Sequence, residues 1–503
     1  MRTPNFNESK DLRVTRQPTP CSNIYFRSHL HSGSFPEPPL KYSLAFIAAF
    51  ALIAASVPSP AQQTWTVKPE WVSAHEYFLS SDVLAGRGSA TRDEELAATY
   101  VASEFESYGL KPAPGMNGYL QTAEIVAPKL DGHATLKIGD AMLQEGSDFF
   151  LATSPGSSAT GTLVRVTAAE TPHSQIPAGA AVLVSGAADP KSLFPAISSL
   201  RRAGAGIILV PEAPGLRALP QMFGGETRVS IRLADDPPRK TPTMMLLHPA
   251  AASKLPATGG AQIAVTVHDV PQTKPRQTFN AIGYLPGTDA SAGTVLLSAH
   301  LDHLGMGRAV NGDAIYNGAN DDAAGTTAVL ELAHALAAGP RLRRSVLFVC
   351  YGSEELGELG STYFGKHPPV PLHDLVANLE FEMIGNQDPK MPAGVLLLTG
   401  WDRSNLGPTL KEHGALLGPD PYPEQHFFER SDNYALALQG VVAHTAGGWG
   451  TPPTYHQPDD DMAHLDIGFM TRAIQSLIEP VRWLAGSDFH PEWNPGGAPK
   501  PGN

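Results

Sequence analysis

The feature that most constrains the fold is an alternation of apolar runs and helical segments after residue 278. Four apolar runs have the length of buried strands: 295–299, 345–351, 376–382 and 394–398. A helical segment, 323–338, separates the first two runs, and another, 467–485, follows the last. This order predicts an α/β fold with a mixed, mostly parallel sheet flanked by helices. In such sheets ligands bind beyond the carboxyl ends of the strands, so chemistry is expected directly after each run.

Histidine and acidic residues stand at those positions. The five loci are His300 with Asp302, Asn320–Asp322, Glu354 with Glu355, Glu380 with Glu382, and Tyr455 with His456. Taken singly, each has an ordinary explanation, since a histidine can be a core residue and acids often cap or begin helices. Their joint occurrence has no such explanation. Because Zn²⁺ takes histidine and carboxylate ligands, the pattern predicts a metal site.

Two neighbouring pairs suggest a division of roles within this site. A histidine that binds a metal usually gives its other N–H to a carboxylate, and Asp302 follows His300 by two residues. The adjacent Glu354 and Glu355 offer two carboxylates with different directions. One of them is suited to bind a metal and the other to accept a proton.

The same residues lie in motifs that resemble the M28 zinc aminopeptidases, in their secreted form with an inserted protease-associated domain. The motifs are SAHLDHLG (298–305), GANDDAAG (318–325), SEELG (353–357), EMIG (382–385), SD (431–432) and YHQPD (455–459), with LAGRG (84–88) and NAIGYLPG (280–287) upstream. The resemblance covers the chain from about residue 65 to residue 485. The resemblance implies the zinc-exopeptidase fold and a peptide substrate.

The resemblance also implies two zinc ions per chain and assigns their ligands. His300, Asp321 and Glu382 would hold one ion, and we call these residues the first ligand group. Asp321, Glu355 and His456 would hold the other ion, and we call them the second ligand group. Asp321 belongs to both groups and would bridge the two ions.

Glu354 and Asp302 are the catalytic residues that the resemblance implies. Two metals about 3.5–4 Å apart share a water molecule and lower its pKa toward neutrality. Glu354 would take the proton of this water and return it to the leaving amine. Asp302 would orient His300 from behind.

Glu382 departs from the family pattern, because many members carry aspartate before the Met-Ile-Gly sequence. Glutamate is a competent ligand with a longer reach. Strand alternation places Glu380 on the same face, so either residue can supply the ligand. The choice between them stays open at this point.

Other activities remain compatible with the sequence. A carboxypeptidase or a glutaminyl-cyclase-like acyltransferase would use the same fold, and an inert receptor-like relative would have lost its catalysis. Arg430 would favour carboxypeptidase action if it bound a substrate carboxylate, whereas Glu380 or Asp432 would suit a free amine. The intact Glu354 and complete ligand groups favour an aminopeptidase.

The remaining regions predict the domain organisation. Residues 62–124, with a helix over 93–108, and 270–486 are assigned to the catalytic domain. Between them, 125–269 consists of short strand-like runs and a helix over 191–203, which indicates the β-rich protease-associated insert. A Pro/Gly-rich tail, 487–503, is expected to be disordered.

The N-terminal 61 residues have the composition of a leader. Lys41 precedes an apolar run, 44–56, and a small-x-small sequence follows at 59–61. This order is typical of a Sec-type signal peptide, and the run is short for a membrane-spanning helix. The mature protein is therefore expected to be secreted or periplasmic, without stable membrane insertion after cleavage, and an uncleaved anchor is the alternative.

Charge and cysteine content exclude other classes. The net charge of −13 and the lack of a basic stripe argue against a nucleic-acid partner. Of the two cysteines, Cys21 lies in the leader and Cys350 lies in an apolar strand. Cys350 is expected to be a buried apolar residue, and the mature chain has no pair for a disulfide. The sequence does not indicate an oligomeric state.

Overall fold

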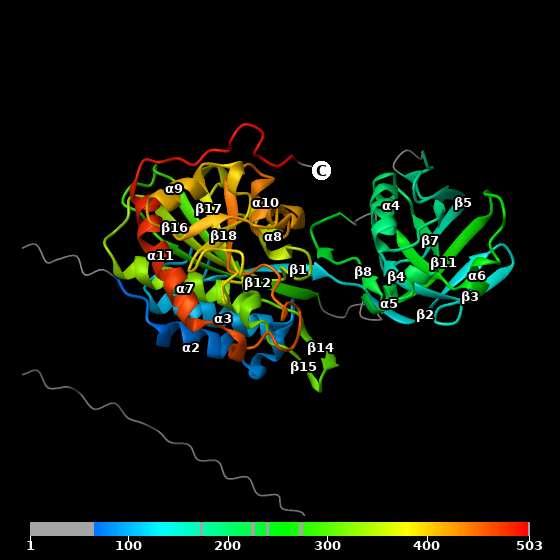
Figure 1. Cartoon of the computed structure of the whole chain (residues 1–503), viewed down its shortest axis with the longest axis horizontal. Coiled ribbons are helices and arrows are strands. Elements are labelled where there is room, and N and C mark those ends of the chain that lie inside the picture. The colour runs from blue at the N-terminus through cyan, green and yellow to red at the C-terminus, as the bar shows by residue number, and fades with distance from the viewer. Residues whose placement is uncertain (1–64, 172–174, 223–226, 238–240, 271–274, 501–503) are drawn as a thin grey trace, which may run out of the picture. The chain divides into compact units, whose positions relative to one another are not determined.

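The computed structural model describes residues 65–500, apart from 172–174, 223–226, 238–240 and 271–274 (Figure 1). The predicted leader, 1–61, lies outside the described residues. Within the described ranges, no helix combines the length and the apolar character needed to cross a membrane.

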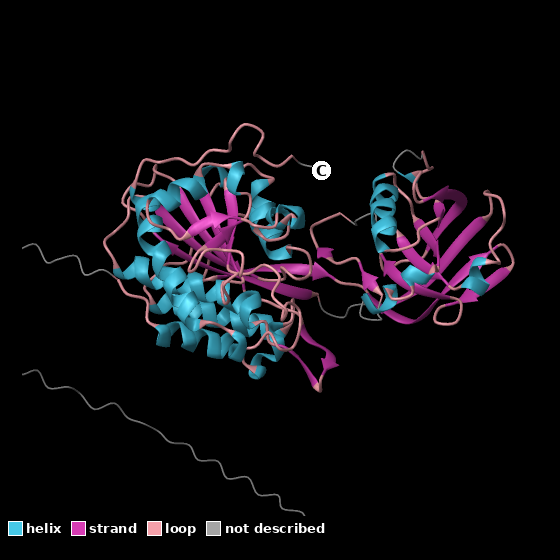
Figure 2. Ribbon diagram, in the orientation of Figure 1, coloured by secondary structure: helices cyan, strands magenta, loops and turns pink. Residues whose placement is uncertain are grey.

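The first sheet has nine strands in the order β19-β18-β20-β17-β13-β16-β12-β1-β9. Its parallel centre consists of β13 (Thr294–His300), β16 (Ser345–Tyr351), β17 (Leu375–Glu382) and β20 (Ala443–Gly447). Its flanks are β12 (Arg276–Leu285), β1 (Leu120–Val126) and β9 (Arg232–Leu233) on one side and β18 (Leu396–Leu398) and β19 (Leu417–Pro419) on the other. The predicted mixed α/β fold is confirmed, as Figure 2 shows.

The prediction of a mostly parallel sheet was wrong in its proportions. Four strand pairs are parallel, at β13/β16, β13/β17, β17/β20 and β18/β19. Four are antiparallel, at β12/β16, β1/β12, β1/β9 and β18/β20. Strand direction depends on the path of the connections, which the apolar character of a strand does not reveal.

Burial on both faces explains the continuous apolar strands at the centre. Every residue of β13 and β16 is buried. Val295 and Leu297 join a core with helices α2 (Pro69–Leu79), α3 (Arg92–Ser107), α7 (Ala324–Ala338) and α11 (Ile467–Gly486). Leu296, on the opposite face, joins a second core with α8 (Leu359–Lys366) and α10 (Asn433–Ala437). Because successive side chains of a strand point to opposite faces, each central strand contributes residues to both cores.

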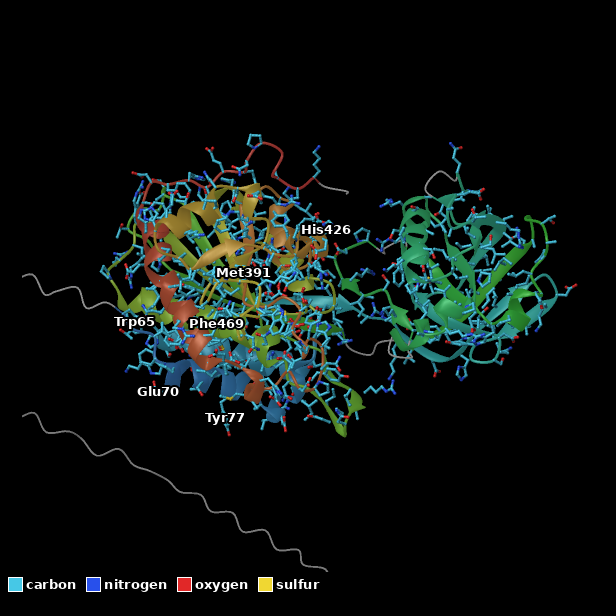
Figure 3. All side chains as sticks on the ribbon, in the orientation of Figure 1. Trp65, Glu70, Tyr77, Met391, His426 and Phe469 are labelled. Atoms are coloured by element: carbon cyan, nitrogen blue, oxygen red, sulfur yellow. The ribbon has the colours of Figure 1, made fainter. Side chains whose placement is uncertain are left out.

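The predicted helices agree with the structure within a residue at most ends. The segments expected at 93–108, 191–203, 323–338 and 467–485 are α3, α4 (Pro190–Arg202), α7 and α11. On α2 the apolar face packs inward, while Glu70 and Tyr77 point outward (Figure 3). Phe469 of α11 is buried. Cys350 is buried in β16, as expected, and it has no disulfide partner among the described residues.

The second sheet also has nine strands, in the order β3-β2-β11-β5-β6-β7-β10-β4-β8. The strands are β2 (Lys129–Ile138), β3 (Ala141–Gln144), β4 (Phe149–Ser154), β5 (Ala159–Thr167), β6 (Ala181–Ser185), β7 (Ile207–Pro211), β8 (Arg228–Val229), β10 (Thr243–Leu247) and β11 (Gln262–Val270). Two apolar cores of its own lie against it. Its assignment as a protease-associated domain, and the domain boundaries, stay predictions.

The C-terminal segment, 487–500, differs from the expectation of disorder. The Trp493 indole N–H donates to the Gly440 carbonyl at 3.2 Å, and the Glu492 amide donates to Asn405 Oδ1 at 2.8 Å. The Trp493 ring lies 5.3 Å from the ring of His444. Hydrogen bonds and aromatic contacts therefore hold this segment, although its Pro/Gly content suggested a free tail.

Candidate metal centre

The predicted ligands gather at the carboxyl ends of the central strands. His300 is the last residue of β13, Glu382 is the last residue of β17, and Glu355 follows β16. Asp321 lies in the turn before α7, and His456 lies in the loop after β20. The parallel arrangement of the centre places these strand ends along one edge of the sheet.

Asp321 divides its two carboxylate oxygens between the two ligand groups. Its Oδ1 lies 3.3 Å from His300 Nε2, and one ligand atom each of His300, Asp321 and Glu382 lie within 4.8 Å of one another. Its Oδ2 lies 3.2 Å from His456 Nε2, which is also 3.3 Å from Glu355 Oε1. This is the arrangement that a carboxylate bridging two cations requires.

The unpartnered atoms of these groups fit a metal. Both ring nitrogens of His300 and Oε1 of Glu355 are buried without a hydrogen-bond partner among the described residues. A buried polar atom without a partner costs about 1–3 kcal/mol, so such atoms need another source of stabilisation. Ligands of a tetrahedral zinc lie about 3.3 Å apart, close to the nitrogen–oxygen distances of the second group.

The electrostatics of the site show competing effects of burial and neighbouring charge. Burial acts to raise the pKa of Asp321, but the adjacent His300 and His456 outweigh it and hold that pKa well below its usual range. Burial raises the pKa of Glu354 well above its ordinary range, against the opposing effect of His300. A cationic centre would favour the ionised form of each of these carboxyl groups.

Asp302 lies beside His300 and the segment that carries Glu354 and Glu355. Its Oδ1 is 3.7 Å from His300 Nδ1 and accepts the Glu354 amide at 3.0 Å. Its Oδ2 accepts from the Ser89 hydroxyl at 2.5 Å and the Glu355 amide at 3.4 Å. One buried carboxylate therefore positions the ends of two strands and the loop that carries Ser89.

The structure separates Glu380 from Glu382. The Glu380 carboxylate accepts hydrogen bonds from Ser431 Oγ at 2.9 Å, from Thr445 Oγ1 at 3.2 Å and from the Asn433 amide. The oxygens of Glu380 therefore accept hydrogen bonds from residues in and around α10. Glu382 is the residue grouped with His300 and Asp321.

Two neighbouring carboxylates, Asp460 and Asp322, hold the main chain around the site, and sequence reasoning missed Asp460. Asp460 accepts the amides of Asn320 and Asp321, both at 3.0 Å. Asp322 accepts the amides of Gly325 and Met383, both at 2.9 Å, and so links the start of α7 to the end of β17. No local signal distinguishes Asp460, because its partners lie about 140 residues away in the chain.

His303 was also missed. Its Nδ1 lies 2.9 Å from Glu355 Oε1 and 3.9 Å from Asp321 Oδ2. It forms a second possible metal-holding set with these two residues. The available signal was a second histidine within the motif 298–305, three residues after His300.

The buried Arg87 connects the segments that carry the ligands. Its guanidinium donates to the carbonyls of Leu301 and Gly318, both at 2.8 Å, and of Asn317 at 2.7 Å. It also donates to the Leu79 carbonyl at 2.5 Å. The planar guanidinium thus joins the end of α2 to the segments next to the predicted ligands His300 and Asp321.

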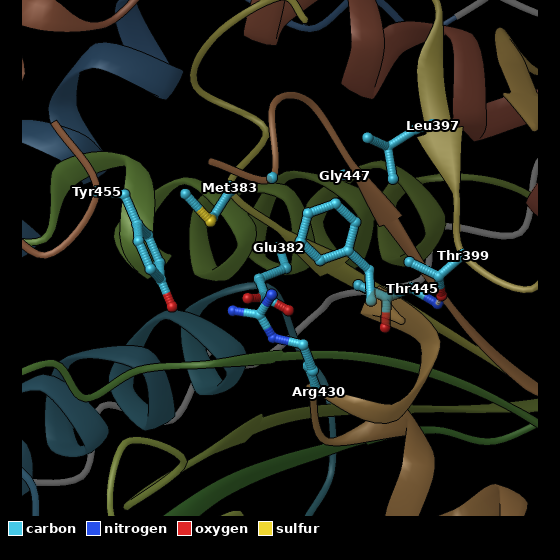
Figure 4. Close-up of a pocket in the computed structure, with 10 residues that line it drawn as sticks. Glu382, Met383, Leu397, Thr399, Arg430, Thr445, Gly447 and Tyr455 are labelled. Carbon is cyan, nitrogen blue, oxygen red and sulfur yellow. Dashed lines mark hydrogen bonds between the residues drawn. The ribbon is translucent and has the colours of Figure 1, made fainter. Parts of the chain in front are cut away.

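A pocket opens beside Glu382 (Figure 4). Its apolar wall includes Met383, Leu397 and Phe427, and Arg430 and Tyr455 also line it. It is therefore placed to receive part of a ligand that reacts at the first ligand group.

Comparison with known proteins identifies the family of this site. Residues 280–480 match the sequence model of Peptidase family M28. This region belongs to peptidase family M28. This range includes every residue of the two ligand groups, and the resemblance seen in the motifs is confirmed.

Similar curated proteins match this chain over part of their length. Leupeptin-inactivating enzyme 1 of Streptomyces exfoliatus is 30% identical over 165 residues, which are 32% of this chain and 34% of that protein. The probable lipoprotein aminopeptidase LpqL of Mycobacterium tuberculosis is 26% identical over 230 residues, 39% of this chain and 43% of that protein. The chain thus spans between about a third and two fifths of the length of these relatives.

A solved structure supports the fold. The aminopeptidase from Aneurinibacillus sp. strain AM-1 superposes with a TM-score of 0.54 at 19% identity, and the match covers 84% of this chain and 94% of that chain.

Proposed function

We propose that the chain is a two-zinc metallo-aminopeptidase that hydrolyses the N-terminal amino acid from peptides. The observation that carries the proposal is the carboxylate of Asp321, whose two oxygens face two separate groups of histidine and carboxylate ligands. The relatives named as aminopeptidases add support from sequence. His300, Asp321 and Glu382 would hold one ion, and Asp321, Glu355 and His456 the other.

Two ions in these groups would supply an activated water and polarise the scissile carbonyl. Glu354 is the base in this proposal, because its amide is held by Asp302 next to the second ligand group. Its carboxylate would accept a proton from the attacking water and pass it to the leaving amine. Asp302 would keep both the His300 ring and the Glu354 main chain in position.

Tyr455 is suited to assist at the developing oxyanion. Its ring stacks on His456 with 3.9 Å between centroids, and the residue lines the pocket beside Glu382. Burial raises its pKa, so its hydroxyl stays protonated and can donate a hydrogen bond. Such donors stabilise negative charge on the carbonyl oxygen in the transition state.

A carboxypeptidase is the second candidate, because Arg430 lines the same pocket and its guanidinium could bind a substrate carboxylate. Peptides that are blocked at one end distinguish the two activities. An aminopeptidase releases amino acids from a C-terminally amidated peptide and fails on an N-acetylated one, whereas a carboxypeptidase shows the reverse. Cleavage of the N-acetylated peptide alone would reject the aminopeptidase.

Replacement of Glu354 by glutamine tests the mechanism. We expect Glu354→Gln to lower kcat by roughly 10²–10⁴-fold, because the proton acceptor is lost, while about two zinc ions per chain remain. The matched control is Glu412→Gln on the exposed end of α9 (Leu406–Glu412), which should keep full activity. Full activity of Glu354→Gln would reject the assignment of the base.

The proposal includes a secreted or periplasmic location, which rests on the leader predicted for residues 1–61. We expect the exported protein to begin close to residue 62 when its N-terminus is sequenced. A mature protein that retains the apolar run at 44–56 would instead be an anchored form.

A further inference from the structure

The buried histidines of the described chain differ in how their ring nitrogens are satisfied. In His444, Nε2 pairs with Ser404 Oγ at 2.7 Å and Nδ1 pairs with the Thr399 carbonyl at 2.8 Å. His303 is as deeply buried as His444, with no exposed surface. Neither of its ring nitrogens has a hydrogen-bond partner among the described residues. Among the described buried histidines, His303 shares this condition with the predicted ligand His300.

The imidazoles of His303 and His456 approach the same pair of oxygens. His303 Nδ1 is 2.9 Å from Glu355 Oε1 and 3.9 Å from Asp321 Oδ2. His456 Nε2 is 3.3 Å and 3.2 Å from these two atoms. The two rings are inclined at 73°, so the nitrogens arrive from different directions.

These approaches are close without being hydrogen bonds. Glu355 Oε1 has no hydrogen-bond partner although His303 Nδ1 lies 2.9 Å away. One ligand-type atom each of His303, Asp321 and Glu355 lies within 4.8 Å of the other two. Ligand atoms around a cation have this geometry, and imidazole nitrogen and carboxylate oxygen are both zinc ligands.

We propose that His303 is a fourth protein ligand of the second metal, beside Asp321, Glu355 and His456. The inference rests on the proposed function, because it requires metal ions in the two ligand groups. The second site then has four protein ligands, and the first has three. The second ion is held more tightly, and the first keeps the open position that a substrate needs.

The surroundings of His303 hold the ring in this position. Its amide donates to the Arg87 carbonyl at 3.1 Å, and its carbonyl accepts the Ser89 amide at 3.2 Å. Gly318, with φ of +61°, lies directly against the ring, since a Cβ there would be 2.5 Å from His303 Cγ. The ring is therefore fixed before any metal binds, which reduces the cost of ordering a ligand.

The test compares His303→Asn with His444→Asn in the full chain. Asparagine keeps an N–H donor near the position of Nδ1 but is a poor zinc ligand. Zinc affinity is measured by competition with a chelator of known affinity. We expect two affinity classes in the wild type, and in His303→Asn a loss of at least tenfold in the tighter class with the weaker class unchanged. His444→Asn should keep both classes.

The variant His303→Cys gives a positive signal. A thiolate is a zinc and cobalt ligand, so this variant should regain tight binding. When it is loaded with Co²⁺, a thiolate-to-cobalt charge-transfer band should appear, which the wild type lacks. Metal-free thermal unfolding of each variant shows that it is folded before metal is added.

The outcomes separate the two proposals. A wild-type chain that binds no zinc would reject the proposed function itself. A wild type with two zinc ions, together with unchanged affinities in His303→Asn and no charge-transfer band in His303→Cys, would reject only the role of His303.

Discussion

At the residue scale, Asp321 faces the two ligand groups with its side chain and is held in place through its main chain. Its side chain faces both ligand groups, while its amide donates to Asp460 Oδ2 at 3.0 Å. Asp460 Oδ1 holds the preceding amide, of Asn320, at the same distance. The main chain is thus fixed from behind, and the carboxylate keeps both oxygens free for the site.

The two glutamates of β17 should respond differently to substitution. We expect Glu382→Ala to lose about one zinc ion per chain, because the first ligand group falls to two residues. Glu380→Gln should keep both ions and lower the thermal midpoint, since an amide group then faces donors that need an acceptor, at a cost of about 1–3 kcal/mol. Zinc analysis and thermal unfolding of both variants measure this, and the reverse pattern of zinc loss would identify Glu380 as the ligand.

At the element scale, the turn after α2 ties the N-terminal helices to the edge of the sheet. Arg87 lies in the segment Asp82–Arg87, which directly precedes the loop that carries Ser89. Arg87 donates to the carbonyl of Leu301, between His300 and Asp302, and Ser89 donates to the Asp302 carboxylate. The motif 84–88, which lies far from the ligands in sequence, therefore acts on the segment that carries them.

Arg87→Lys tests this connection against a matched control. Lysine keeps the charge but lacks the planar fork, so it cannot satisfy the same four carbonyls. Arg344 is also buried and donates to two carbonyls, of Ala292 at 3.0 Å and Leu484 at 2.7 Å. We expect Arg87→Lys and Arg344→Lys both to lower the thermal midpoint. Only Arg87→Lys should weaken zinc binding, by roughly 10–100-fold; equal zinc affinity in both variants would contradict the prediction.

At the scale of the whole molecule, buried acids make stability depend on pH. Glu76 of α2 has no exposed surface, and neither carboxylate oxygen has a hydrogen-bond partner among the described residues. Burial raises its pKa from the ordinary value of 4.5 to about 8. The folded chain therefore keeps a proton on Glu76 between these values, whereas the unfolded chain releases it.

The sign of this effect follows from the raised pKa. Its contribution to stability is fully present below about pH 4.5 and is lost as the pH rises through about 8. Glu76→Gln removes the ionisable group, so the variant should gain stability relative to the wild type as the pH rises. Thermal unfolding of both proteins across this range measures the difference, and a difference that is independent of pH would contradict the buried ionisation.

Local patterns were sufficient for much of the fold after residue 278. The strand β16 matches its predicted range, 345–351, and α7 begins one residue later than expected. A strand buried on both faces must be apolar throughout, and its length follows from its sequence. The position of His300, Glu355 and Glu382 at strand ends follows in turn, because a parallel centre brings its carboxyl ends to one edge.

The tertiary structure decided the features that depend on distant partners. Glu380 and Glu382 share a strand and a residue type, and only the positions of Ser431 and Thr445 direct Glu380 away from the ligand role. His303 approaches Glu355 from a turn more than fifty residues earlier. By itself the sequence determined which residues can bind metal, through their chemistry and their place at the strand ends. Which of them converge depended on contacts between segments far apart in the chain, and no local pattern encodes those contacts.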